Sequence, residues 1–233
     1  MFVIPCKFEQ QKPIIFDCVK NIRLHNTETI VIVDSNSDDV SYGMQLSKTY
    51  NDVIFENVKN INYEIGALKI VFEKYDFSNY FLLHDSMIVH HNLLHIKNYE
   101  AVSVRYFNSW NGVGGINLFS SHNNTMQYRY GFDNEEQKNI VHNWNKNNKI
   151  PYSYNGVFGS SFCVKKEILQ KLNDEKLFEC LPKNKLESQA MERHLGILFN
   201  KINIDHYSHS LMGEHHTNSF NSKYITKIIM GRQ

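Results

Sequence analysis

The sequence predicts an α/β fold, a single domain in which a mostly parallel central sheet is flanked by helices. Short apolar, β-branched runs alternate with segments of helical periodicity through the first half of the chain. The run 29–33 is β-branched throughout, which is typical of a strand buried on both faces of a parallel sheet. Polar residues follow these runs directly, at the strand ends that line the ligand crevice of an open α/β sheet.

The elements of the first half follow in chain order. Strands are predicted at 2–4, 29–33, 52–55 and 80–83, and the first of them ends at Pro5. Pro13 occupies the place of a first-turn proline before a helix. A second helix is predicted over about 65–75 from its apolar spacing. The resulting order is strand–helix–strand–strand–helix–strand.

The second half is less regular. Residues 101–155 are predicted as loops with one helix near 135–144, followed by a glycine-marked strand over 156–164. Helices are predicted at 166–172 and at about 186–201. No internal repeat or long linker divides the chain. We therefore expect one domain over 1–205 and a C-terminal tail, 206–233, that closes over the active site.

Composition excludes several classes of protein. Of 233 residues, 42% are hydrophobic and 21% are charged, which is enough to build a core. The 25 basic and 24 acidic side chains nearly balance, so no nucleic acid partner is expected. No run approaches the ~18 apolar residues of a transmembrane segment, and no secretory signal is evident. The four widely spaced cysteines indicate reduced core thiols in a cytoplasmic protein, in the host cytoplasm if the source is viral.

Acidic residues end two of the predicted strands. A carboxylate at Asp85, followed by Ser86, could hold a divalent cation that bridges a diphosphate, because hard cations prefer oxygen ligands. The alternative is an ordinary turn or capping aspartate. Asp34 and Ser35 could hydrogen-bond to a nucleobase or ribose, whereas the alternative for them is a solvated turn.

Histidines cluster after the fourth predicted strand and again in the tail. His91 and His95 have the i,i+4 spacing of a metal pair, but no glutamate follows His91, so the zinc-protease pattern is absent. We expect these two, with His84 and His90, to be solvated or capping side chains. His215 could supply one imidazole to a metal already held by a carboxylate.

Two glutamates in the helix predicted at 186–201 are candidates for a general base, which needs one carboxylate near an acceptor hydroxyl. Glu187 falls on the buried side of the first turn, where it caps the helix or faces a cavity. Glu192 lies on the flank beside Arg193, and its alternative is a surface ion pair of little energetic value. Helix position slightly favours Glu187.

The order of these segments resembles that of GT-A glycosyltransferases, in particular the inverting family 2 type, over roughly residues 2–205. The chain lacks P-loop, dinucleotide-binding and G-x-S-x-G patterns. The D-x-D metal motif of the family is reduced to Asp85-Ser86-Met87, and neither candidate glutamate is followed by the usual aspartate. The resembling segments are Val3–Pro5, Ile30–Asp39, Gly66–Lys69, Phe81–Ser86, Asn155–Phe162 and Glu187–Leu198.

The resemblance implies a hexosyltransferase that moves a sugar from a nucleotide-diphosphate-sugar donor to the hydroxyl of a glycan or other acceptor, with inversion. It implies Mn²⁺ or Mg²⁺ as cofactor, with Asp85 and His215 as metal ligands, and Glu187 or Glu192 as the base. The donor nucleotide would be bound by Pro5, Asp34, Ser35, Lys69, Asp85 and Ser86.

Two alternatives stay open at this point. The incomplete D-x-D motif would also suit a non-catalytic nucleotide- or carbohydrate-binding module. A nucleotidyltransferase would share the sheet and the metal, but it would need a glycine-rich phosphate loop, and no glycine occurs between Pro5 and Lys12.

Overall fold

The structure, a computed structural model, describes residues 1–8, 14–108, 119–122, 125–128, 131–146, 155–214 and 222–228. Within these ranges six strands form the central sheet, in the order β3-β2-β1-β4-β11-β6. Four of them run parallel, and β11 is antiparallel to both of its neighbours. The α/β class and the mostly parallel sheet are confirmed. The strands are β1 (Phe2–Cys6), β2 (Ile30–Asp34), β3 (Val53–Glu56), β4 (Asn79–Leu82), β6 (Ala101–Ser103) and β11 (Phe162–Lys165).

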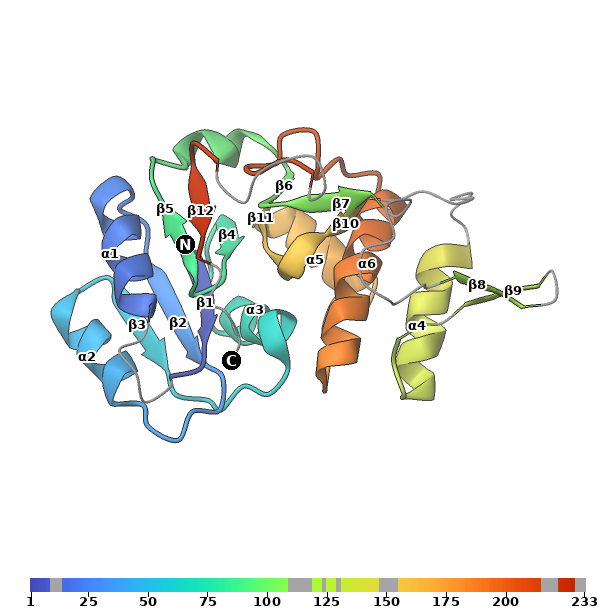
Figure 1. The fold of residues 1–233 in the computed structure, drawn as a ribbon, viewed down its shortest axis with the longest axis horizontal. Coiled ribbons are helices and arrows are strands. Elements are labelled where there is room, and N and C mark those ends of the chain that lie inside the picture. Colours follow the sequence, from blue (N-terminus) through green and yellow to red (C-terminus); the bar gives the residue numbers. More distant parts are fainter. Residues whose placement is uncertain are drawn as a thin grey trace.

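Helices cover both faces of this sheet (Figure 1). Alternate residues of β1 point to opposite faces, so that Phe2 and Ile4 join one apolar cluster and Val3 joins the other. The Phe2 cluster includes residues of α1 and α2, and the Val3 cluster includes residues of α3, α4, α5 and α6. The helices are α1 (Ile15–His25), α2 (Ser41–Thr49), α3 (Tyr63–Lys74), α4 (Glu135–Lys146), α5 (Lys166–Asp174) and α6 (Lys185–Lys201).

Short elements complete the described part of the chain. Three 3₁₀ turns are η1 (Leu94–Asn98), η3 (Phe158–Ser160) and η4 (Leu177–Glu179). Three antiparallel pairs lie outside the central sheet. They are β7 (Tyr106–Asn108) with β10 (Asn155–Val157), β5 (Met87–Val89) with β12 (Ile225–Lys227), and β8 (Phe119–His122) with β9 (Thr125–Tyr128). No helix of the described residues is long and apolar enough to cross a lipid bilayer.

Three details of the sequence-based prediction were wrong. Residues 101–155 were expected to form loops with one helix, but strands β6, β7, β8 and β9 also lie there, and β6 belongs to the central sheet, because strands of three or four residues leave little periodicity in the sequence. Helix α2 lies between the second and third strands, where no helix was expected, because its apolar signal is short and it buries only Gly43 and Leu46. The strand predicted over 156–164 is two strands, β10 and β11, separated by η3. Gly159 (φ 64°) and Ser160 (φ 49°) adopt left-handed backbone conformations that interrupt an extended chain. The four cysteines are free and buried, as expected.

Residues that follow α6 pack back on the sheet. The backbone N–H of Ser103 donates to the His206 carbonyl oxygen (2.6 Å), and that of Met212 donates to the Val104 carbonyl oxygen (2.8 Å). Further on, β12 lies beside β5, next to the carboxyl end of β4 (Figure 1). Part of the predicted tail therefore lies close to the predicted site, and whether it closes over a bound substrate stays a prediction.

Candidate functional site

The sheet has a topological switch point between β1 and β4. The chain proceeds from β1 to β2 and β3 on one side, and β4 then pairs with the other edge of β1. In open α/β sheets ligands bind outside the carboxyl ends of the strands at such a point. Asp34 ends β2, and His84 and Asp85 follow β4, so that the two acidic strand ends predicted from the sequence flank the end of β1.

Pro5 explains why the sheet opens at this point. Pairing of β1 with β4 ends at Val3 and Leu82, whereas pairing with β2 continues to Cys6 and Asp34. A proline has no N–H to donate to a further rung on the β4 side. The residue that the sequence placed beside the donor nucleotide therefore marks the separation of the two strands.

Asp34 is fully buried, and its two carboxylate oxygens differ. Oδ1 accepts the backbone N–H of Ser37 (3.1 Å), and the Asp34 carbonyl oxygen accepts the N–H of Asn60 (2.8 Å). Oδ2 has no hydrogen-bond partner among the described residues. A buried acceptor without a partner costs free energy that a ligand donor would recover. Ser35 continues the β1 ladder by donating its N–H to the Cys6 carbonyl oxygen (2.8 Å).

Asp85 lies on the other side of Cys6 and is half-buried. Burial raises the pKa of the Asp85 carboxyl, and the neighbouring His84, the Cys6 thiol and the Ser86 backbone act against this rise. Burial is also the largest cause of the raised pKa of the Cys6 thiol. The nearby Asp85, Cys18 and Asp34 raise it further. Both acidic residues act on one thiol, so Asp34 and Asp85 lie at the same edge of the sheet, as the sequence predicted.

His84 belongs to this site and is not the solvated or capping residue expected. Burial lowers the pKa of its imidazole, and the positive charge of Lys227 lowers it further. The neutral ring donates through Nε2 to the Gly159 carbonyl oxygen (2.6 Å), because a carbonyl can only accept. Nε2 also lies 3.5 Å from Oε1 of Glu64 at the start of α3. A Cβ at Gly159 would lie 2.9 Å from His84 Nε2, so this close approach requires glycine.

Glu192 reaches the same region from the middle of α6. Burial raises its pKa to about 7, and the charge of Glu64 adds to this rise, whereas Arg193, Lys185 and Lys227 oppose it. A carboxyl with this pKa exists in both protonation states near neutral pH and can accept or donate a proton. Helix α6 packs closely on β10 at Gly196, where a Cβ would lie 2.0 Å from the Asn155 carbonyl oxygen.

Glu187 has a structural role in this fold. It is 2% exposed, and its Oε2 accepts the backbone N–H of Lys183 (2.6 Å) while its Oε1 accepts that of Asp133 (3.3 Å). Its own N–H donates to Oδ1 of Asn184, the N-cap of α6 (3.0 Å). Both carboxylate oxygens are engaged at the helix start, so the geometry favours Glu192 over Glu187 as a base.

Lys69 lies on a different face of α3 from Glu64. It lies in α3, five positions after Glu64, which is about 140° around the helix from the residue that faces His84. Its ammonium forms an i,i+4 ion pair with Glu73 (3.8 Å), on a face where Glu73 is largely exposed. Its predicted contact with a diphosphate stays a prediction. Ser86 is half-buried, and its carbonyl oxygen accepts the N–H of Ile228 (2.9 Å).

Lys227 is a member of the site that sequence reasoning missed. It is half-buried at the end of β12, where it pairs with Met87 two residues after Asp85. Burial lowers its pKa, and the charges of Glu192 and Glu64 act in the opposite direction. Little in the sequence points to this residue, because a single lysine in a polar tail has no pattern that links it to a strand end far earlier in the chain.

The residues that the structure describes do not form a metal site on their own. Among the described residues, no group of three or more His, Cys, Asp or Glu side chains is placed to hold a metal ion. Asp85 is one carboxylate with a raised pKa, and the positive charge of Lys227 acts on it. His215, the second predicted ligand, lies outside the described residues.

Comparisons with known proteins give no family. No family model and no curated protein matches the sequence. Among solved structures, residues 1–349 of S. aureus TarS match at 11% identity and a TM-score of 0.42, over 84% of this chain and 55% of that chain. The structure of TarS 1–349 in complex with UDP matches at 11% identity and a TM-score of 0.43, over 82% of this chain and 53% of that chain. The bifunctional IspDF from Campylobacter jejuni matches at 13% identity and a TM-score of 0.39, over 82% of this chain and 46% of that chain. The chain thus spans about half the length of these proteins.

Proposed function

We propose that this chain transfers a sugar from a nucleotide-diphosphate-sugar donor to a hydroxyl group of a glycan or other acceptor. One observation supports the proposal: Asp34 and Asp85 stand at the ends of β2 and β4, next to a switch point, and Lys227 interacts electrostatically with both Asp85 and Glu192. To catalyse this transfer, the site must bind the nucleoside and the diphosphate of the donor, and it must supply a general base for the acceptor hydroxyl.

The nucleoside is assigned to the β2 end of the site. Oδ2 of Asp34 would accept a hydrogen bond from a base or ribose donor, which supplies the partner that this oxygen lacks among the described residues. Because Asp34 is fully buried, the nucleoside must displace the side chains that cover the carboxylate. The half-buried Pro5 in β1, and Ser35, which directly follows β2, would form the wall beside it.

Glu192 is assigned the role of general base. Its carboxylate accepts the proton of the acceptor hydroxyl while the hydroxyl oxygen attacks the anomeric carbon. The bond between that carbon and the diphosphate oxygen breaks, and the nucleoside diphosphate leaves with the electron pair, which gives inversion. A pKa of about 7 suits this role, since the base is largely ionised in slightly alkaline solution and still basic enough to take the proton.

A divalent cation, Mn²⁺ or Mg²⁺, stays part of the prediction that came from the family resemblance. Asp85 would supply one oxygen ligand and His215 an imidazole nitrogen, and the diphosphate would supply further oxygen ligands. Since no group of three or more potential ligands among the described residues is placed to hold a metal ion, no catalytic step is assigned to the cation.

The test is a turnover assay with nucleotide-sugar donors. Wild-type protein is incubated with UDP-glucose, UDP-N-acetylglucosamine and GDP-mannose, with Mn²⁺ and with EDTA, and release of nucleoside diphosphate is measured. We expect slow hydrolysis of at least one donor and loss of about 100-fold in rate for Glu192→Gln. Glu167→Gln, an exposed glutamate in the first turn of α5, is the matched control.

The alternatives give different results in the same assay. A binding module would bind a donor in calorimetry without turnover in either metal condition. A nucleotidyltransferase would release pyrophosphate from a nucleoside triphosphate in the presence of a sugar phosphate. Turnover that is the same in wild type and Glu192→Gln would remove Glu192 from the mechanism.

A further inference from the structure

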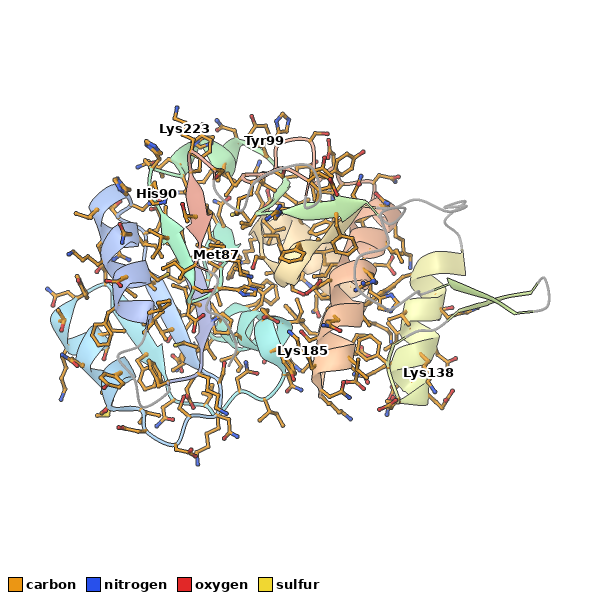
Figure 2. The ribbon with its side chains drawn as sticks, in the orientation of Figure 1. Met87, His90, Tyr99, Lys138, Lys185 and Lys223 are labelled. Carbon is orange, nitrogen blue, oxygen red and sulfur yellow. The ribbon has the colours of Figure 1, made fainter. Side chains whose placement is uncertain are left out.

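The C-terminal strand β12 directs one lysine into the protein. Side chains alternate along a strand, so Ile225 and Lys227 share a face of β12. Ile225 is fully buried in the apolar cluster that contains Phe2 and Ile4. Lys227 therefore points inward as well. Lys223, which precedes the strand, is exposed, and Figure 2 shows it at the edge of the molecule. Met87, the strand partner of Lys227, lies further inside in the same view.

Several charged side chains lie near Lys227, but no carboxylate of the described residues forms an ion pair with its ammonium. Its charge interacts with Glu192, Glu64, Asp85 and Lys185. No carboxylate oxygen of the described residues lies within the 4.0 Å of an ion pair from the Lys227 ammonium. The ammonium instead lies 5.5 Å from the centre of the Phe158 ring. A partly desolvated cation is thus held near three carboxylates without contact to any of them, and this leaves its three N–H donors available.

The need for a cation follows from charge balance at this edge of the sheet. The carboxyl groups of Glu64, Asp85 and Glu192 interact with Lys227, and that of Glu192 also with Lys185, and without Lys227 they outnumber the positive charge that remains to bind a diphosphate. The donor set for a metal is incomplete among the described residues. Of the two lysines, Lys227 is the one that β12 places opposite Met87, just after the end of β4. The donor diphosphate would lie there, beside Asp85.

We propose that Lys227 is the diphosphate-binding cation of this site and stabilises the nucleoside diphosphate as it leaves. The inference rests on the proposed function, whose donor contains the diphosphate. As the bond from the anomeric carbon breaks, the bridging oxygen gains an electron pair, and the ammonium donates charge-assisted hydrogen bonds to the phosphate oxygens. Lys227 keeps its proton throughout, so the step balances without a further reactant. The C-terminal segment thereby becomes part of the substrate site.

The experiment is isothermal titration calorimetry in EDTA, with inorganic pyrophosphate, UDP and GDP as charged probes and uridine and guanosine as uncharged ones. Lys227→Met is compared with wild type, with Lys227→Arg, which keeps the charge, and with Lys223→Met, which removes an exposed charge from the same segment. We expect Lys227→Met to weaken pyrophosphate, UDP and GDP about tenfold or more and to leave the nucleosides unchanged. Lys227→Arg should retain most of the affinity, and Lys223→Met should match wild type.

The outcomes separate this inference from the proposed function. Equal pyrophosphate affinity in wild type and Lys227→Met overturns the inference, as does binding that needs Mn²⁺ or Mg²⁺ and is unaffected by Lys227→Met. Lys227-dependent binding of pyrophosphate without turnover of any nucleotide sugar supports the cation site and counts against the transferase. Thermal unfolding of each variant shows whether a lost affinity reflects a lost fold. A wild-type protein that binds none of the charged probes refutes both.

Discussion

Replacement of Glu192 by glutamine should stabilise the folded protein at alkaline pH. The ordinary pKa of a glutamate carboxyl is 4.5, and burial in α6 raises that of Glu192 to about 7. Each pKa unit corresponds to about 1.4 kcal/mol between the two protonation states, so keeping the ionised form in the folded protein costs up to about 3 kcal/mol. Because Glu192 is half-buried and water screens part of this cost, we expect a gain of about 1–2 kcal/mol for Glu192→Gln at pH 8.

The sign of the effect follows from proton binding. Between the unfolded pKa of 4.5 and the folded pKa of about 7 the folded state binds more protons, so wild-type stability falls as pH rises through this window and then levels off. Glutamine cannot ionise and shows no such loss. Urea unfolding followed by circular dichroism at about pH 4, 6 and 8 should give equal stabilities at the lowest pH and a growing advantage of the variant above it. A stability difference that does not change with pH would refute the burial of an ionisable carboxyl at this position.

Three further substitutions test the remaining parts of the structure. Glu187→Gln should lower the free energy of unfolding by about 2 kcal/mol, because charge-assisted bonds to two backbone N–H groups are weakened, whereas exposed Glu167→Gln should change it by about 0.5 kcal/mol or less in the same urea titration. Gly196→Ala should lower it by about 2 kcal/mol or more, since the added Cβ would meet the Asn155 carbonyl oxygen, and an unchanged melting temperature would contradict this packing. Asp34→Asn should weaken nucleoside binding about tenfold in calorimetry, and equal affinity would remove Asp34 from the nucleoside site.

The strands of the first half could be predicted because burial on both faces leaves a continuous apolar signal. Ile30–Val33 is such a run, and in the fold it lies between β3 and β1 with its residues divided between two cores. Helix α2 was missed for the opposite reason, since it packs against the edge strand β3 and buries little. The division of 156–164 into two strands depends on left-handed backbone at Gly159 and Ser160, which the apolar pattern does not encode.

The candidate site could be predicted only in part. Strand ends are readable in sequence, so Asp34 and Asp85 were found by the change from apolar to polar residues. Glu187 and Glu192 could not be separated in this way, because the sequence gives a helix position but not the backbone N–H groups that engage Glu187. Glu64 was not singled out at all, since one glutamate near a helix start is more often a favourable charge at the helix dipole than a site residue.

The sequence by itself determined the α/β fold class of this protein and which polar residues end its strands, because both follow from local patterns: apolar periodicity and the polar residues that interrupt it. Only the tertiary structure decided which side chains meet at these strand ends. Glu64, His84, Glu192 and Lys227 come from four elements that the fold brings together. Their charges and burial act through space, so residues distant in the chain set each other's protonation, and no local pattern contains that information.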